Sequence, residues 1–152
     1  MMAYHLAAPS FFKLKTQASR IESVLVSALP EVAQVHIREQ TTSDIIYKTS
    51  NVTIDGTDYV CGMFLSVGDS GGLSKFCKIE QILLVNPNVS FLCLDYDSWY
   101  VEHLLSYELS TANTSLSIHL HSCLNDTVPL SAYKVDGSLL LTLKRFIEVR
   151  QN

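Results

Sequence analysis

Residues 76–96 read FCKIEQILLVNPNVSFLCLDY, and this stretch decides the fold. Two apolar runs, 76–85 and 89–96, flank the turn sequence Asn86-Pro87-Asn88. β-Branched and aromatic residues favour strands, whereas Asn and Pro favour the turn between them. Residues 89–96 are apolar on both parities, and the preceding run is nearly so, which is typical of strands covered on both faces. The stretch therefore predicts a buried β-hairpin.

Similar patterns continue on either side of this hairpin. Asp55-Gly56 and Asp136-Gly137 each join two short β-branched or aliphatic runs, as two-residue hairpin turns do. Residues 116–120 alternate between apolar and polar side chains, which predicts a half-buried strand. The chain is therefore expected to be mainly β, with six to eight antiparallel strands over residues 44–147. They are predicted to form a small SH3-like barrel, closed or partly open.

One helix is predicted, near the N-terminus. Apolar residues recur there at three- and four-residue spacings, Ser10 is a suitable N-cap, and Pro30 follows the pattern. We expect a helix over residues 10–29 that packs on the barrel. No repeat or linker divides the sequence, so residues 1–152 are expected to form a single domain.

Composition and charge narrow the functional classes. The chain has 152 residues, of which 47% are hydrophobic and 17% charged, with a formal net charge of −4. This composition excludes a disordered tail, and the negative charge argues against strong nucleic-acid binding. No run reaches the ~20 apolar residues of a membrane span, and no export signal precedes the first apolar positions, so an intracellular, nuclear or cytoplasmic protein is expected. Four N-glycosylation patterns support the extracellular alternative; they begin at Asn51, Asn88, Asn113 and Asn125.

A glycine-rich string is the sharpest local motif. Gly68-Asp69-Ser70-Gly71-Gly72 resembles the nucleophile segment of trypsin-like serine proteases. However, the upstream sequence has no histidine in the setting that this family requires, and Leu73 stands where the family has proline. A hairpin bend explains the string without catalysis, and no catalytic residue is assigned.

Metal ligands are sparse in the sequence. His119 and His121 lie two apart on a predicted strand, so their rings are expected on one face, and Cys123 has the same parity. This pair is the best candidate for zinc ligands. However, two histidines on the solvent-facing side of a strand occur more often as ordinary surface residues than as a pair of metal ligands. Cys61, Cys77 and Cys93 lie in apolar runs and are interpreted as packed free thiols. No cofactor is predicted.

A candidate binding surface follows the central hairpin. Aromatic rings and carboxylates alternate there, and such sets hold cations by ring-face contact and charge. The residues proposed to bind are Asp95, Tyr96, Asp97, Trp99 and Tyr100.

Several strings resemble bromo-adjacent homology (BAH) domains. These are residues 59–65 (YVCGMFL), 76–82 (FCKIEQI) and 89–94 (VSFLCL), and residues 101–109 and 128–133 are similar to segments of uncharacterised, transposon-associated vertebrate proteins of this architecture. The resemblance implies a barrel that binds a protein partner, such as a histone or another chromatin component.

Together these observations predict a non-enzymatic protein-interaction module that uses the aromatic and acidic surface. The alternative is a small hydrolase or zinc-dependent enzyme that uses the 68–72 loop or the His119/His121 pair. A third class is a self-assembling β protein.

Overall fold

The protein is mainly β. The computed structural model describes residues 16–70, 73–110 and 115–142. The described elements, in chain order, are β1 (Thr16–Ser19), β2 (Glu22–Leu25), η1 (Val26–Ala28), α2 (Glu31–Arg38), β3 (Ile45–Thr49), β4 (Asn51–Ile54), β5 (Thr57–Val60), β6 (Phe64–Ser70), β7 (Leu73–Val85), β8 (Asn88–Val101), η2 (Glu102–Leu104), β9 (Ser106–Ser110), β10 (Leu116–Leu120), η3 (His121–Cys123), β11 (Ala132–Val135) and β12 (Ser138–Leu141).

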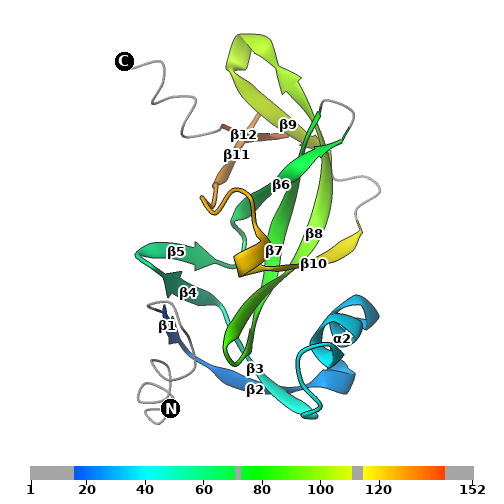
Figure 1. The fold of residues 1–152 in the computed structure, drawn as a ribbon. Helices are drawn as coiled ribbons and strands as arrows, with labels where there is room; N and C mark the ends of the chain where they lie inside the picture. Colours follow the sequence, from blue (N-terminus) through cyan, green and yellow to red (C-terminus); the bar gives the residue numbers. More distant parts are fainter. Residues whose placement is uncertain (1–15, 71–72, 111–114, 143–152) are drawn as a thin grey trace.

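The predicted central hairpin is confirmed as β7 and β8, the two longest strands described (Figure 1). They belong to a nine-stranded sheet with the order β11-β12-β9-β8-β7-β3-β2, in which β6 also pairs with β7 and β10 with β8. The short strands β1, β4 and β5 form a separate three-stranded sheet. All pairings are antiparallel, as predicted.

The predicted closed barrel is not found. The path of the large sheet ends at β11 on one side and at β2 on the other, so the sheets do not close on themselves. The described residues contain twelve strands, and ten of them lie in the range where six to eight were predicted. Two features explain the difference: a separate small sheet takes up β1, β4 and β5, and β8 divides one of its edges between two partners.

One edge of β8 is divided between two partner strands. The other edge pairs with β7 over residues 88–96. Along the divided edge, residues 90–94 pair with β10 and residues 97–101 pair with β9. Residues 90–94 of β8 are therefore paired on both sides, the rest of the strand is paired on one side, and the partner on the second edge changes near Asp95.

A β-bulge interrupts the pairing of β7 with β8. Gln81 lies opposite Leu92, but Ile79 lies opposite Cys93, so Glu80 is the extra residue on β7. A shift of one residue exchanges the two faces of a strand. As a result, Ile79 and Cys77 share a face with Ile82 beyond the bulge, although their sequence parity differs from that of Ile82.

Three buried clusters form the core. The first lies on one face of β7 and β8 and includes Tyr59, Cys77, Ile79, Ile82, Phe91 and Cys93. The second lies under α2 and includes Val26, Ala33, Ile37, Ile46, Leu83 and Leu92. The third lies at the β9 end and includes Phe64, Phe76, Tyr96, Leu109 and Leu141. Both faces of the central hairpin are therefore covered, as predicted.

The helix predicted for residues 10–29 is wrong over the part that the structure describes. Residues 16–19 and 22–25 are strands β1 and β2, paired with β4 and β3, and residues 26–28 form a 3-10 turn; residues 10–15 lie outside the described part. The α-helix instead begins after Pro30, whose fixed φ suits the start of a helix better than its interior. Ala33 and Ile37, four residues apart, bury its inner face.

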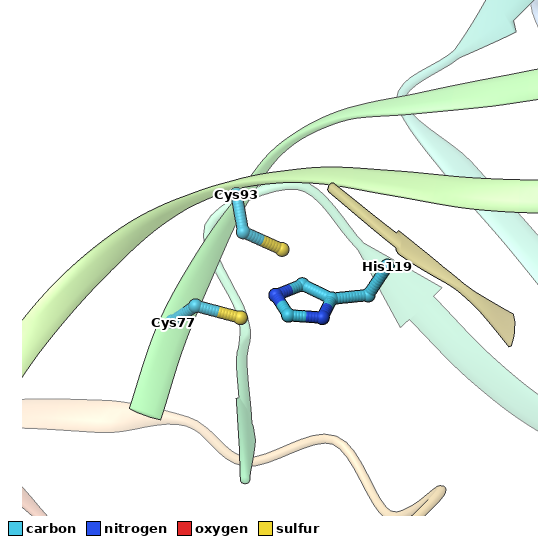
Figure 2. A group of neighbouring side chains, drawn as sticks. All are labelled: Cys77, Cys93 and His119. Carbon is cyan, nitrogen blue, oxygen red and sulfur yellow. The ribbon is translucent and has the colours of Figure 1, made fainter. Parts of the chain in front are cut away.

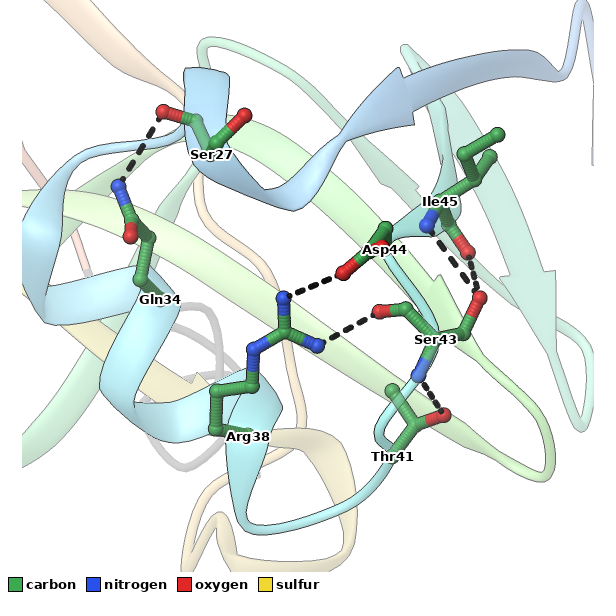
Figure 3. Close-up of polar contacts among 7 residues, drawn as sticks. All are labelled: Ser27, Gln34, Arg38, Thr41, Ser43, Asp44 and Ile45. Atoms are coloured by element: carbon green, nitrogen blue, oxygen red, sulfur yellow. Dashed lines mark hydrogen bonds and ion pairs between the residues drawn. The ribbon is translucent and has the colours of Figure 1, made fainter.

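Polar contacts hold the loop after this helix (Figure 3). The Arg38 guanidinium donates to the Ser43 carbonyl at 2.8 Å and to the Asp44 carboxylate at 3.1 Å. Gln34 donates to the Ser27 carbonyl at 3.3 Å, which ties the helix to η1. These contacts fix how α2 enters and leaves its place beside β10.

Within the described ranges, no helix has the length and apolar character needed to cross a membrane.

Candidate metal centre

Three strands bring two thiols and one imidazole together. Cys77 comes from β7, Cys93 from β8 and His119 from β10, and one ligand atom of each lies within 4.8 Å of the other two. Figure 2 shows the ring nitrogen remote from the Cβ of His119, which is Nε2, directed between the two sulfur atoms. No other group of three or more such side chains is found in the described residues.

The strand register places these side chains on one face. Ile79 lies opposite Cys93 and Cys77 lies opposite Asp95, so Cys77 and Cys93 are diagonal neighbours. On the other edge of β8, Ser117 lies opposite Cys93, and His119 follows two residues later. Directly opposed residues point to the same side of a sheet, so one face carries both thiols and the imidazole.

The site is buried in apolar surroundings. Cys77 and Cys93 have no exposed surface and belong to the first core cluster, and His119 is half-buried. A buried polar or charged group is costly unless it is paired with another group or with a metal ion. The grouping of three such side chains therefore needs a chemical explanation.

Proximity shifts the ionisation of the three groups in different directions. Hydrogen bonds from the Cys93 thiol and from His119 lower the pKa of Cys77 to about 6, although burial opposes the shift. The pKa of Cys93 is raised because its thiol is hydrogen bonded to Cys77 and because it is buried. The pKa of His119 is raised by its hydrogen bond to Cys77. The arrangement favours a Cys77 thiolate beside a protonated imidazole.

These shifts predict how the free protein titrates. One thiolate is expected to form with a midpoint near pH 6, which ultraviolet absorbance of the thiolate would detect. The Cys77→Ser variant should lose this transition, whereas Cys61→Ser should keep it because burial raises the pKa of Cys61. Persistence of the transition in Cys77→Ser would contradict this ionisation order.

A polar chain extends from the imidazole. The Ser117 hydroxyl lies 2.9 Å from His119 Nε2 and donates to Asp95 Oδ1 at 2.6 Å. The Ser115 hydroxyl donates to Asp95 Oδ2 at 3.2 Å, and the Asp95 amide donates to the Ser115 carbonyl at 2.7 Å. Asp95 is therefore held beside the three candidate ligands.

The two cysteines are free and poorly placed for a disulfide. Diagonal residues on neighbouring strands lie roughly 7–8 Å apart, beyond the usual Cα separation of a disulfide of about 4.4–6.8 Å. Their sulfur atoms nevertheless converge on His119. Convergence of this kind suits a shared ion better than a covalent bond.

The structure separates the predicted histidine pair. His119 faces the two cysteines, but the strand ends at Leu120 and His121 starts the 3-10 turn η3. The His121 ring packs edge-on against Tyr59, with ring centroids 5.6 Å apart, and Cys123 is exposed. His121 is not in the group of three, while His119 has partners that sequence parity did not reveal.

The predicted binding residues lie along β8 but do not share a face. Asp95, Asp97 and Trp99 alternate with Tyr96 and Tyr100, so they divide between the two sides of the strand. Tyr96 is 7% exposed and packs in the third cluster, whereas Trp99 and Tyr100 are 45% and 42% exposed. The five residues do not form one surface, and Asp95 lies beside the candidate metal centre.

The 68–72 string lies at the end of the β6–β7 hairpin. Asp69 pairs with Ser74 and Ser70 with Leu73 in the strand ladder, and Gly68 has φ +115°, a conformation that favours glycine. Gly71 and Gly72 lie outside the described residues. This placement agrees with the predicted hairpin bend.

Comparison with protein-family models, curated proteins and solved structures gives no significant match.

Proposed function

We propose that this protein binds a thiophilic metal ion, with zinc as the best fit, through Cys77, Cys93 and His119. The observation that carries the proposal is the convergence of their ligand atoms to within 4.8 Å on one buried sheet face. Zinc takes thiolate sulfur at about 2.3 Å and imidazole nitrogen at about 2.0–2.1 Å in tetrahedral geometry. Small side-chain rotations would bring the three atoms to those distances.

The chemistry of the donors also supports zinc. Thiolate and imidazole ligands select zinc and copper(I) over magnesium and calcium, which prefer oxygen. The lowered pKa of Cys77 makes one thiolate available near neutral pH. Binding displaces the proton of Cys93 and that of Nε2, so affinity should rise with pH.

The test is a zinc titration of the full chain in competition with a chromophoric chelator. The wild-type protein is expected to bind one zinc ion per chain. Cys93→Ser and His119→Gln should each weaken binding by more than the roughly 10–100-fold that loss of an outer hydrogen-bond partner costs. Circular dichroism would show whether each variant keeps its β structure.

Matched controls are present in the same chain. Cys61 and Cys123 lie outside the cluster, so Cys61→Ser and Cys123→Ser should leave zinc affinity unchanged. Absence of zinc binding by the wild-type chain, or unchanged affinity in folded His119→Gln, would reject the proposal.

The protein-interaction module expected from the sequence stays a prediction. Its support is now limited to the exposed rings of Trp99 and Tyr100.

A further inference from the structure

The proposed zinc site has three protein ligands, and Asp95 lies beside them, outside the group of atoms within 4.8 Å of one another and linked to it through Ser117. Asp95 is opposite Cys77 and follows Cys93 by two residues, so it shares their face of the sheet. It is also at the point where the edge of β8 changes partner, between the residues paired with β10 and those paired with β9. At this break, the Asp95 side chain is half-buried beside the cluster.

Asp95 lies near the His119 imidazole but forms no ion pair with it or with another group in the described part of the protein. The ion pairs found there are Arg38–Asp44 and Lys78–Glu80, and neither involves Asp95. Its carboxylate oxygens instead accept hydrogen bonds from the neutral hydroxyls of Ser115 and Ser117. A half-buried carboxylate of this kind is stabilised by a nearby cation, and the site proposed above would provide one.

Metal binding would also rearrange the Ser117 contact. The Ser117 hydroxyl donates to Asp95 and lies 2.9 Å from His119 Nε2, the same nitrogen that faces the two thiols (Figure 2). Nε2 has one lone pair, and coordination would occupy it, so Ser117 would no longer share this nitrogen. The Asp95 carboxylate is linked to Nε2 through this single hydroxyl.

We propose that Asp95 is the fourth metal ligand, which completes a site of two cysteines, one histidine and one aspartate. This inference rests on the proposed zinc-binding function. Closed four-coordinate sites are typical of structural zinc, whereas three protein ligands and a water are typical of catalytic zinc. Coordination by Asp95 therefore makes the site a structural one that joins β7, β8 and β10.

Cobalt(II) substitution tests this assignment, because its visible spectrum reports the coordination shell. Azide is the probe, since it adds to a metal position that water holds. The spectrum of the wild-type cobalt protein is expected to stay unchanged with azide, whereas Asp95→Ala should show an azide-dependent shift. Asp97→Ala, an exposed carboxylate on the same side of β8, should behave as the wild type.

The Ser117→Ala variant distinguishes direct coordination of the metal by Asp95 from an effect of Asp95 that acts through Ser117. If Asp95 binds the metal directly, Ser117→Ala stays insensitive to azide; if Asp95 acts only through Ser117, this variant responds like Asp95→Ala and the proposal fails. An azide response in the wild-type protein, or none in Asp95→Ala, also overturns it. A wild-type chain that binds neither cobalt nor zinc rejects the proposed function itself, which is a distinguishable result.

Discussion

Phe91→Ala is expected to lower the free energy of unfolding by about 3–5 kcal/mol, as truncation of a buried phenylalanine does. Phe91 has no exposed surface and lies at the middle of the first core cluster. Its ring centroid is 5.0 Å from that of Tyr59 and 6.2 Å from that of His121. Removal of the ring would leave a cavity between the central hairpin and η3, which the neighbouring strands are too constrained to fill.

Urea denaturation followed by circular dichroism measures this loss. Val135→Ala is the control, because Val135 is 42% exposed on β11, the strand at the edge of the sheet. This substitution should lower the free energy of unfolding by less than about 1 kcal/mol. If Phe91→Ala does not fold, Phe91→Leu retains part of the packing and should show an intermediate loss. A loss for Phe91→Ala no larger than that of Val135→Ala would contradict the central position of this ring.

Zinc is expected to raise the free energy of unfolding by about 2.7 kcal/mol when free zinc is 100-fold above its dissociation constant. The proposed ligands come from three strands, so the site forms only when β7, β8 and β10 are assembled. An ion that binds the folded chain in preference to the unfolded one stabilises it by mass action. Zinc that binds thiols of the unfolded chain would reduce this gain.

Thermal and urea unfolding with defined free zinc would measure the stabilisation, and a chelator should reverse it. Cys61→Ser is expected to gain as much stability as the wild type, whereas Cys93→Ser should gain little. Equal stabilisation of Cys93→Ser and Cys61→Ser would show that zinc acts elsewhere on the chain.

The hairpins were predictable because their turns are local. Asp55 and Asp136 have positive φ, and the glycine after each does too, as such two-residue turns require. The alternation of residues 116–120 likewise predicted β10. The apolar spacing of residues 97–105 suits either a helical turn or extended chain, and the structure continues β8 to Val101 before the turn η2.

The N-terminal helix was predicted wrongly because tertiary pairing decided the structure there. Residues 16–19 and 22–25 fill positions beside β4 and β3, and these ladders outweigh an apolar spacing that also suits a helix. Leu29 is buried as that spacing indicates, but it reaches the core from the residue before Pro30, and Leu25 of the same spacing is 53% exposed.

The candidate metal centre was only partly predictable. His119 was identified by strand parity, yet its partners depend on the bulge at Glu80. Without that extra residue, regular pairing from the Asn86-Pro87 turn would place Cys77 opposite Tyr96 and on the other side of the sheet from Cys93. The position of a bulge cannot be predicted reliably from one sequence. Cys77 and Cys93 were therefore interpreted as separate packed thiols.

The double pairing of β8 governs how the native state opens. Residues 90–94 are paired on both edges, every residue from 88 to 101 is paired on at least one edge, and this strand contributes to all three core clusters. Neither end of the molecule can therefore detach without exposing β8. We expect the β8 amides to be among the slowest to exchange with deuterium, and the described segments to unfold as one cooperative unit despite their separate apolar clusters.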